Sequence, residues 1–364
     1  MSLITIDEVN RLEPGSYVYV DMRGDDAYAH GHIPDAINWN RREETDMLPR
    51  DKKLIVYCSI GENSIEAAEE LIEQGFEAYS LKRGFREWLL TQYKGLSSEE
   101  LKKYDRQIIL PQIGVEGQKK LKNSKVLIIG AGGLGSPAAL YLAGAGVGTI
   151  GIMDADEVGL SNLHRQIVHS VKKVGMNKAE SAAEAMNELN DMVKVNVYKA
   201  YLTPDNAEEI ISQYDFIIDA ADNFETKFLI NDACVLQHKP FCHAGVLQFM
   251  GQVMTYVPGD CPCYRCFFEE IPERRFGQTC NEAGVLGPVV GIVGCIQATE
   301  AIKYICGIEG LLTGRLLIFD GLDMEVHIVN FKSKNDSCRV CGKDRQITSV
   351  KENAAEYSGG ICHI

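Results

Sequence analysis

The stretch that decides the fold is KVLIIGAGGLGSPAALYLAGAGVGTIGIMDADEVGLSNLHRQ, residues 125–166. An apolar strand ending near Ile129 leads into a glycine-rich turn, and a helix of small residues leads on to a second strand ending at Asp154. The glycines of the turn are Gly130, Gly132, Gly133 and Gly135. Such glycines let the backbone approach a phosphate, and a carboxylate after the second strand can bind a ribose hydroxyl. The stretch predicts a nucleotide site. By itself it suits a NAD-dependent oxidoreductase as well as it suits an enzyme that transfers a nucleotide.

Charged side chains further along the chain separate these two interpretations. SNLHRQ, residues 161–166, contains Arg165, and Lys178 adds a second cation on the next predicted helix. A dehydrogenase needs no guanidinium there, whereas an enzyme that neutralises a triphosphate does. DFIIDAADN ends another apolar strand with Asp219 and Asp222, and a carboxylate near polyphosphate usually holds Mg²⁺. The pattern therefore favours nucleotidyl transfer over hydride transfer.

Taken together, these motifs resemble the MoeB/ThiF family of adenylyltransferases, which activate ubiquitin-like sulfur-carrier proteins. The resemblance runs from about Tyr104 to Cys341 and includes YDRQIILPQIG, GAGGLGSPAA, DADEVGLSNLHRQ, GMNKAESA and DAADNFETK. It implies that ATP and Mg²⁺ bind here. The residues that it assigns, besides the four glycines, are Asp154 for the ribose, Asn162, Arg165, Gln166 and Lys178 for the phosphates, and Asp222 for the magnesium-bound phosphate region.

The same resemblance implies a homodimer. Arg106, in YDRQ, matches an arginine that the family lends across the dimer interface into the partner's ATP site. Simpler roles stay open for some of these residues: Arg106 also suits a solvated surface position, and Asp156 and Asp219 also suit strand-end caps.

Cysteine spacing predicts a metal site. Among twelve cysteines, four form two Cys-x-x-Cys pairs, which are Cys263 with Cys266 and Cys338 with Cys341. Four thiolates suit tetrahedral Zn²⁺ and leave no open position for water, so we expect a structural zinc site. The resembled family has the same four-cysteine site.

Composition limits the classes of function. A net charge of −14 argues against a general nucleic-acid binder, and no basic amphipathic segment suggests a membrane surface. The start, MSLITIDEVN, lacks the pattern of a secretory signal, and no stretch reaches about 18 uninterrupted apolar residues. The two most apolar stretches, near 140–153 and 285–296, are glycine-rich and read as buried elements. We expect a cytoplasmic protein.

The first part of the chain is a separate unit. Two predicted strands, SYVYVDMR and DKKLIVYC, end at Arg23 and Cys58, and a helix follows the loop SIGENS. Loop amides and a helix N-terminus stabilise a thiolate or an anionic persulfide. DMRGDDAYAHGHIPDAINW, VYCSIGENS and LKRGFREWL resemble a rhodanese-like sulfurtransferase domain, in which Cys58 matches the persulfide-forming cysteine. Because the loop has Glu62 and lacks the arginine or lysine common in rhodaneses, we expect a protein persulfide as sulfur donor, such as that of a cysteine desulfurase. A degenerate domain used for docking is the alternative.

These observations predict three segments: a rhodanese-like α/β domain at 1–95, an adenylation domain at 96–345 and a flexible tail at 346–364. A Ser-x-x-Glu capping signature at Ser97 and Glu100 marks the start of the second. The expected fold class is α/β, a rhodanese-like domain followed by a Rossmann-like ATP-binding domain with a mainly β-sheet, zinc-bound C-terminal part.

The combination predicts that the chain adenylates the C-terminal Gly-Gly carboxylate of a ubiquitin-like carrier, and that a Cys58 persulfide then converts it to a thiocarboxylate. Molybdopterin, thiamine, cysteine and siderophore synthesis all use such carriers. Cys280 is either the second thiol that this transfer needs or a packing cysteine. Cys58, Cys280, Arg106 and Arg165 are the expected catalytic residues. A tRNA-adenylating relative, a NAD-dependent oxidoreductase and a non-catalytic scaffold are the alternatives.

Overall fold

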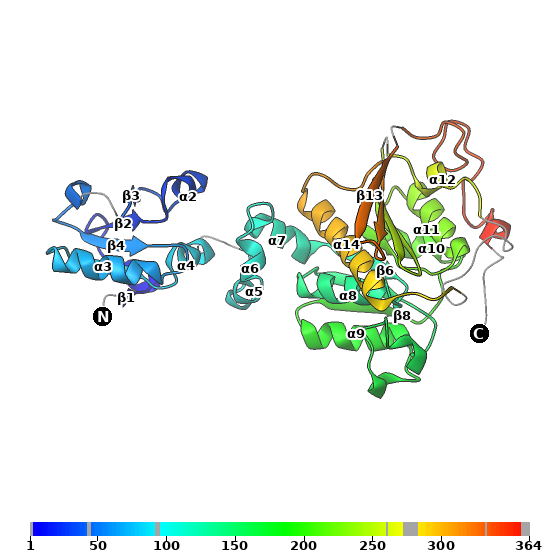
Figure 1. Ribbon diagram of the computed structural model, residues 1–364, viewed down its shortest axis with the longest axis horizontal. Coiled ribbons are helices and arrows are strands. Elements are labelled where there is room, and N and C mark those ends of the chain that lie inside the picture. The colour runs from blue at the N-terminus through cyan, green and yellow to red at the C-terminus, as the bar shows by residue number, and fades with distance from the viewer. Residues whose placement is uncertain are drawn as a thin grey trace. The chain divides into compact units, whose positions relative to one another are not determined.

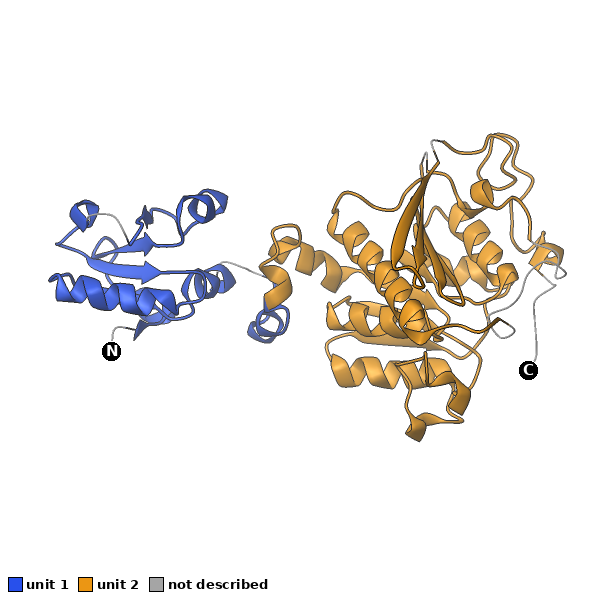
Figure 2. Cartoon of the chain, viewed as in Figure 1, with its two compact units in different colours: residues 1–105 blue, residues 106–364 orange. Residues whose placement is uncertain are grey.

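The computed structural model describes residues 3–41, 45–91, 95–259, 261–271, 283–331 and 333–357 (Figure 1). The chain divides into two compact units, Met1–Asp105 and Arg106–Ile364 (Figure 2). Both are α/β, as the sequence predicts.

The first unit is built on a five-stranded parallel sheet with the order β1-β5-β4-β2-β3. Its central strand, β4, is buried on both faces, because Leu54 and Val56 pack in one apolar cluster while Ile55 and Tyr57 pack in another. The strands are β1 (Leu3–Ile4), β2 (Tyr17–Asp21), β3 (Ile37–Asn38), β4 (Lys53–Tyr57) and β5 (Ala78–Leu81). The helices are α1 (Ile6–Val9), α2 (Asp25–His30), α3 (Asn63–Glu73), α4 (Gly84–Thr91) and α5 (Ser98–Lys103), with a 3-10 turn at Thr45–Met47.

The predicted capping box is present at the start of α5. The Ser97 hydroxyl accepts from the Glu100 amide at 3.1 Å, and the Glu100 carboxylate accepts from the Ser97 amide at 2.6 Å. The helix that this box starts belongs to the first unit, which extends to Asp105. Arg86 of α4 forms an ion pair with Asp105 and so joins this helical segment to the sheet domain.

The second unit contains an eight-stranded mixed sheet with the order β13-β12-β11-β10-β9-β6-β7-β8. The strands from β10 to β8 in this order are parallel, and β10 to β13 form an antiparallel series. The strands are β6 (Lys125–Ile129), β7 (Thr149–Met153), β8 (Lys194–Tyr198), β9 (Phe216–Asp219), β10 (Phe241–Leu247), β11 (Met250–Tyr256), β12 (Arg315–Asp320) and β13 (Glu325–Asn330). The mainly β C-terminal part is therefore confirmed.

Helices cover both faces of this sheet (Figure 1). On one face α8, α9 and α14 contribute small and branched residues to a core with Val126 and Ile128 of β6. On the other, α10 and α11 pack with Leu127 and Ile129. The helices are α6 (Asp105–Ile108), α7 (Gly114–Asn123), α8 (Gly135–Gly144), α9 (Lys178–Leu189), α10 (Ala207–Ser212), α11 (Phe224–Leu236), α12 (Tyr264–Phe267) and α14 (Gly287–Cys306), with 3-10 turns at Leu160–Asn162, Val171–Lys173 and Ala354–Tyr357.

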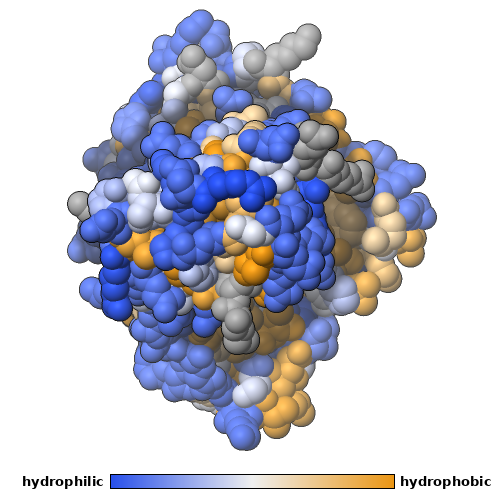
Figure 3. Space-filling model, turned by 90° about the vertical axis from the view of Figure 1, so that its left-hand side faces the viewer, coloured by the Kyte–Doolittle hydropathy of each residue, from blue (hydrophilic) through white to orange (hydrophobic). Residues whose placement is uncertain are grey.

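Helix α14 contains the second apolar stretch of the sequence. Within the described part of the chain, α14 is the one helix that is both long enough and apolar enough to cross a membrane, with a mean hydropathy of 1.4. In this fold it packs against α7, α8, β9, β10 and β11, and half of its apolar window is buried. Its apolar character is explained by this place in the core. Figure 3 shows a largely hydrophilic face, on which hydrophobic residues form small separate groups.

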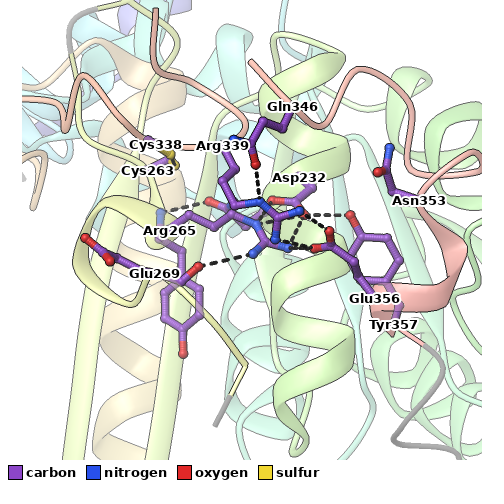
Figure 4. A network of polar contacts seen from close by, with 12 residues as sticks. Asp232, Cys263, Arg265, Glu269, Cys338, Arg339, Gln346, Asn353, Glu356 and Tyr357 are labelled. Carbon is purple, nitrogen blue, oxygen red and sulfur yellow. Dashed lines mark hydrogen bonds and ion pairs between the residues drawn. The ribbon is translucent and has the colours of Figure 1, made fainter. Parts of the chain in front are cut away.

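Part of the expected flexible tail is packed. Ile347 and Val350 are fully buried and Tyr357 is 6% exposed, all in the cluster around α11. The Tyr357 hydroxyl donates to the buried Asp232 at 2.6 Å (Figure 4). The polar composition of this segment hid the few apolar residues that anchor it. The residues beyond 357 lie outside the described part.

Candidate active sites

The glycine turn lies at the centre of the second sheet. It connects β6 to α8 where the strand order reverses, with β7 on one side of β6 and β9 on the other. Gly130 has a φ of +104°, which side chains rarely adopt, and a side chain at Gly135 would collide with the Gly130 carbonyl oxygen. In open α/β sheets, ligands bind at this kind of position, beyond the carboxyl ends of the strands. The turn therefore has the shape expected for a phosphate cradle.

Asp154 follows β7 and contacts the turn. Its Oδ2 accepts from the Ala131 amide at 2.8 Å, and its Oδ1 accepts from the Asp156 amide at 2.9 Å. Burial raises the pKa of Asp154, although the Lys178 ammonium and these two amides oppose the shift. The carboxylate is thus fixed beside the turn, where the sequence predicts a ribose ligand.

The predicted phosphate ligands follow on a loop. The Asn162 side chain accepts from the Gly159 amide at 2.8 Å, and Arg165 is partly exposed, with Nη1 3.2 Å from the Ser161 carbonyl oxygen. Gln166 is 4% exposed, and its Oε1 has no hydrogen-bond partner among the described residues. Its Nε2 lies 3.6 Å from the place of a Cβ on Gly132. A buried, unpartnered polar atom beside a glycine turn fits a polar ligand there.

The second predicted cation lies at the same edge of the sheet. Lys178, the first residue of α9, pairs with Asp156 at 2.8 Å, and Asp156 also accepts from the Tyr201 hydroxyl at 2.6 Å. That bond raises the pKa of Tyr201 to about 12, with smaller contributions from the charges of Asp154 and Asp222. Asp156 is therefore an ion-pair partner of Lys178. The exposed Asp222 lies close enough to share this electrostatic environment.

Asp219 differs from its neighbour Asp222. It is fully buried at the end of β9 and contacts His243 Nδ1 at 2.7 Å and Lys227 Nζ at 3.4 Å. Burial raises the pKa of Asp219, but the Lys227 ammonium and the His243 hydrogen bond outweigh it and hold the pKa below its usual value. Its carboxylate is occupied by this network, so Asp222 is the one of these two carboxylates that is exposed.

The four predicted metal ligands lie together. Their sulfur atoms are all within 4.8 Å of one another, with contacts of 3.4 Å between Cys266 and Cys341, 3.6 Å between Cys263 and Cys338, and 3.9 Å between Cys263 and Cys266. A tetrahedral site with Zn–S bonds of about 2.3 Å requires sulfur separations of about 3.8 Å. The cluster therefore fits a tetrahedral metal ion.

Each cysteine pair carries an arginine that holds the C-terminal segment (Figure 4). Arg265 Nη2 lies 3.2 Å from Glu356, and Arg339 Nη1 lies 3.1 Å from the same carboxylate. Arg339 Nε also donates to Gln346 at 2.9 Å. The spacing that identifies the metal site did not indicate this network.

Cys58 lies at the end of β4 in the first unit and is 6% exposed. Its sulfur accepts from the Gly61 amide at 3.1 Å and from the Ser64 hydroxyl at 3.6 Å, and Ser64 contacts Ser80 at 2.9 Å. Burial raises the pKa of Cys58, but the Ser64 hydroxyl and the loop amides outweigh it, so the pKa is lowered. These groups stabilise a thiolate without a cation in the loop.

The comparisons with known proteins follow this division. Residues 104–340 match the ThiF family, and residues 7–91 match the rhodanese-like domain. The chain belongs to the ThiF family. Its first unit carries a rhodanese-like domain.

Curated relatives of this ThiF-family chain are named adenylyltransferase and sulfurtransferase MOCS3. The protein from Culex quinquefasciatus is 44% identical over 282 residues, which are 78% of this chain, and that from Dictyostelium discoideum is 47% identical over 274 residues, which are 73%. The matched regions span 64% of the length of each relative.

Solved structures confirm the fold of the ThiF core. Escherichia coli MccB with MccA has a TM-score of 0.59 and is 26% identical, covering 66% of this chain and 74% of that protein. PaaA has a TM-score of 0.58 and is 27% identical, covering 66% of this chain and 76% of that protein.

One expected catalytic residue, Arg106, is not brought into the ThiF nucleotide site. Arg106 is exposed, and its neighbour Gln107 donates to the Ala145 carbonyl at 3.0 Å, at the end of α8 opposite to the glycine turn. Helix α8 has 10 residues and is about 15 Å long, so Arg106 does not reach its own turn. Cys280 lies outside the described residues.

Other cysteines of the ThiF core pack within its buried or partly buried elements. Cys234 and Cys242 are fully buried, and burial raises the pKa of each thiol well above its usual value. Cys306 is 7% exposed and Cys295 is partly exposed on α14. His169, which no sequence motif indicated, also contacts the glycine turn.

Proposed function

We propose that this chain uses ATP to adenylate the C-terminal Gly-Gly carboxylate of a ubiquitin-like sulfur-carrier protein, and that a persulfide on Cys58 then converts this end to a thiocarboxylate. The observation that carries the proposal is the presence of a ThiF nucleotide site and a rhodanese thiol in one chain. The names of the curated relatives support both activities. We assign sulfur transfer to residues 1–95 and adenylation to residues 96–345.

The nucleotide site offers a group for each part of ATP. The glycine turn and the side chains of Asn162 and Gln166 would hold the phosphates, Asp154 would bind the ribose, and Arg165 and Lys178 would balance negative charge. Asp222 would hold Mg²⁺, which when bound lowers the negative charge of the phosphates. The site thereby favours attack on phosphorus by another anion.

The first step makes the carrier reactive. A carboxylate oxygen of the carrier attacks the α-phosphorus, the bond to the bridging oxygen of the β-phosphate breaks, and pyrophosphate leaves with that electron pair. Arg165 and Lys178 stabilise the charge that develops on the phosphate oxygens. The product is an acyl-adenylate, whose AMP group leaves more readily than the oxygen of a free carboxylate.

The second step transfers sulfur. The outer sulfur of a Cys58 persulfide attacks the acyl carbon, AMP leaves, and an acyl disulfide joins the carrier to Cys58. A second thiol then attacks the Cys58 sulfur, which releases the thiocarboxylate and leaves a disulfide between Cys58 and that thiol. Cys280 is our candidate for this thiol. A thiol reductant must open the disulfide and return the Cys58 thiolate, which a persulfide donor such as a cysteine desulfurase then reloads.

Further parts of the proposal concern assembly. Zn²⁺ at the four cysteines would be structural, because all four ligand positions are taken by protein. Arg106 would enter the nucleotide site of a partner in a homodimer, consistent with its distance from its own turn. We place the enzyme in the cytoplasm and the reaction in molybdopterin synthesis, with thiamine-type sulfur transfer as the second pathway.

The test is ATP–pyrophosphate exchange with a candidate carrier, followed by intact-mass analysis of that carrier with a persulfide source. We expect Arg165→Ala to abolish exchange, while the exposed Lys172→Ala control keeps it. The carrier should gain the mass difference of one sulfur for one oxygen, and lose this gain with Cys58→Ser. Exchange that persists in Arg165→Ala would reject the adenylation site. A nicotinamide absorbance change or AMP transfer to tRNA would instead support the alternative activities.

A further inference from the structure

We propose that His169 is a positioning residue of the adenylation site, which holds the glycine turn and helix α9 in the arrangement that receives ATP. This inference rests on the proposed function. His169 Nε2 lies 2.9 Å from the carbonyl oxygen of Ala131 in the turn, and its Nδ1 lies 2.8 Å from the Ser181 hydroxyl on α9. The histidine is 8% exposed, so water has little room to replace either contact. One side chain therefore connects two elements of the nucleotide site.

The chemistry of these contacts fixes the direction of the hydrogen bonds. A carbonyl oxygen only accepts, so Nε2 carries the proton and donates to Ala131, and Nδ1 accepts from the Ser181 hydroxyl. Burial lowers the pKa of His169 to about 4, and the nearby Lys178 and Lys173 ammonium groups contribute in the same direction, against the hydrogen bond to Ala131. The ring is thus neutral near pH 7, and this tautomer persists across the physiological range.

Both backbone polar groups of Ala131 are held by side chains. Its amide donates to Asp154 Oδ2 at 2.8 Å, while its carbonyl accepts from His169. Asp154 is the proposed ligand of the ribose, so the Asp154 carboxylate and the histidine together determine the orientation of the turn. Without His169, the Ala131 carbonyl would lose a buried partner and the turn would be free to rotate about its glycines.

The other end of the histidine reaches the second cation. Ser181 lies three residues after Lys178, one turn along α9, and Lys178 is the first residue of that helix. The His169–Ser181 contact therefore fixes the distance between the glycine turn and the helix end that carries the Lys178 ammonium. Because productive phosphate binding requires groups placed within about 0.5 Å, loss of this contact should weaken nucleotide binding before it unfolds the domain.

A positioning role and a purely structural role predict different results. If His169 only stabilises the fold, its loss reduces the fraction of folded protein, and the remaining molecules bind ATP with unchanged Kd. If it positions the turn, the folded molecules themselves bind ATP more weakly. The Kd for ATP, measured by calorimetry on full-length protein without carrier, separates the two, because Kd does not depend on the active fraction.

The experiment compares His169→Ala and His169→Gln with wild type. Glutamine restores an N–H donor for Ala131, whereas alanine does not. Loss of one buried hydrogen bond corresponds to a change in Kd between about fivefold and about a hundredfold. We expect at least a tenfold increase for His169→Ala and less than about threefold for His169→Gln. The control is His238→Asn, an exposed histidine at a φ of +53° that asparagine also adopts.

If His169→Ala does not fold, Ser181→Ala decides the question. That variant leaves the turn intact and frees only the Nδ1 end of the ring, and we expect its Kd to rise several-fold. Wild-type affinity in whichever of these two variants folds would overturn the positioning role. Failure of the proposed function has a different signature: wild type would bind ATP without catalysing pyrophosphate exchange for any carrier.

Discussion

Arg265 and Asp232 form a two-pronged ion pair that joins the four-cysteine cluster to helix α11. Nε and Nη2 of the arginine each lie 2.7 Å from a carboxylate oxygen, and neither residue is more than 2% exposed. Burial raises the pKa of Asp232 despite the guanidinium. The arginine stands between two predicted metal ligands, Cys263 and Cys266. The geometry of the cluster and the packing of α11 are therefore linked.

Removing one partner of this pair should strongly destabilise the second unit. We expect Arg265→Met to lower the free energy of unfolding by about 3–5 kcal/mol, because Asp232 would be left buried without its counter-charge. Denaturant unfolding of the full chain measures this. Arg345→Met, at an exposed position, is the matched control and should change stability by less than about 0.5 kcal/mol. Equal effects of the two substitutions would contradict this account.

Metal removal should loosen the C-terminal segment 346–357. Arg265 and Arg339 both hold Glu356 from within the cysteine pairs, so loss of the metal would let both arginines move. We expect a chelator to increase amide hydrogen exchange in this segment more than in helix α8, which lies on the other face of the sheet. Restoring Zn²⁺ should reverse the change. Exchange that stays the same in a protein shown by metal analysis to be stripped would refute the coupling.

The sequence predicted the elements that are signalled locally. The glycine turn, the strand before Cys58 and the Ser97–Glu100 capping box are each defined by residues a few positions apart, and the structure has all three. The four-cysteine cluster was also predictable, because each Cys-x-x-Cys pair is a local pattern even though 75 residues separate Cys263 from Cys338.

What the sequence did not reveal depends on long-range contacts between single residues. Asp232 lies within an apolar helical stretch and gives no sign that Arg265 and Tyr357 will meet it. His169 is an isolated histidine whose partner, Ala131, is 38 positions away. The expected tail was misjudged up to Tyr357 for the same reason, since a few buried residues outweigh a polar composition.

Acid should destabilise the protein through His169. Its folded-state pKa of about 4 lies below the ordinary value of 6.5, so the unfolded chain binds a proton first as pH falls. The contribution of neutral His169 to the free energy of unfolding is complete above about pH 6.5. It is lost progressively down to about pH 4, and the total loss is about 3 kcal/mol. We therefore expect the stability difference between wild type and His169→Gln to shift by this amount in favour of the variant between pH 7 and pH 4. Parallel pH profiles would show that His169 is not buried as described.

Arg106 and Arg165 should complement each other between protomers. If Arg106 enters the partner's site, each single alanine variant is inactive in pyrophosphate exchange. In a mixed dimer, the Arg106→Ala protomer retains Arg165 and receives Arg106 from its partner, so one of the two sites is complete. We expect activity to return when the two variants are unfolded together and refolded as a mixture. No recovery, in a sample where mixed dimers are detected by mass, would place Arg106 outside the site.

The reactivity of Cys58 should depend on Ser64. The Ser64 hydroxyl is the largest contribution that lowers the thiol pKa, ahead of the loop amides and against burial. We expect the pH midpoint of Cys58 alkylation to lie below that of an ordinary cysteine, and Ser64→Ala to move it upward. The rate is followed by mass analysis of the peptide that contains Cys58, so that other thiols do not interfere.

A matched variant separates this effect from disturbance of the loop. Ser80→Ala removes a hydroxyl that lies 2.9 Å from the Ser64 hydroxyl and acts on the sulfur only through Ser64, so its shift should have the same sign and be smaller. The thiolate is also the form that takes up sulfur, and therefore Ser64→Ala should slow persulfide loading in proportion to the thiolate that it loses at pH 7. An unchanged alkylation midpoint in Ser64→Ala would mean that the loop amides alone stabilise the thiolate, and loading should then be unaffected as well.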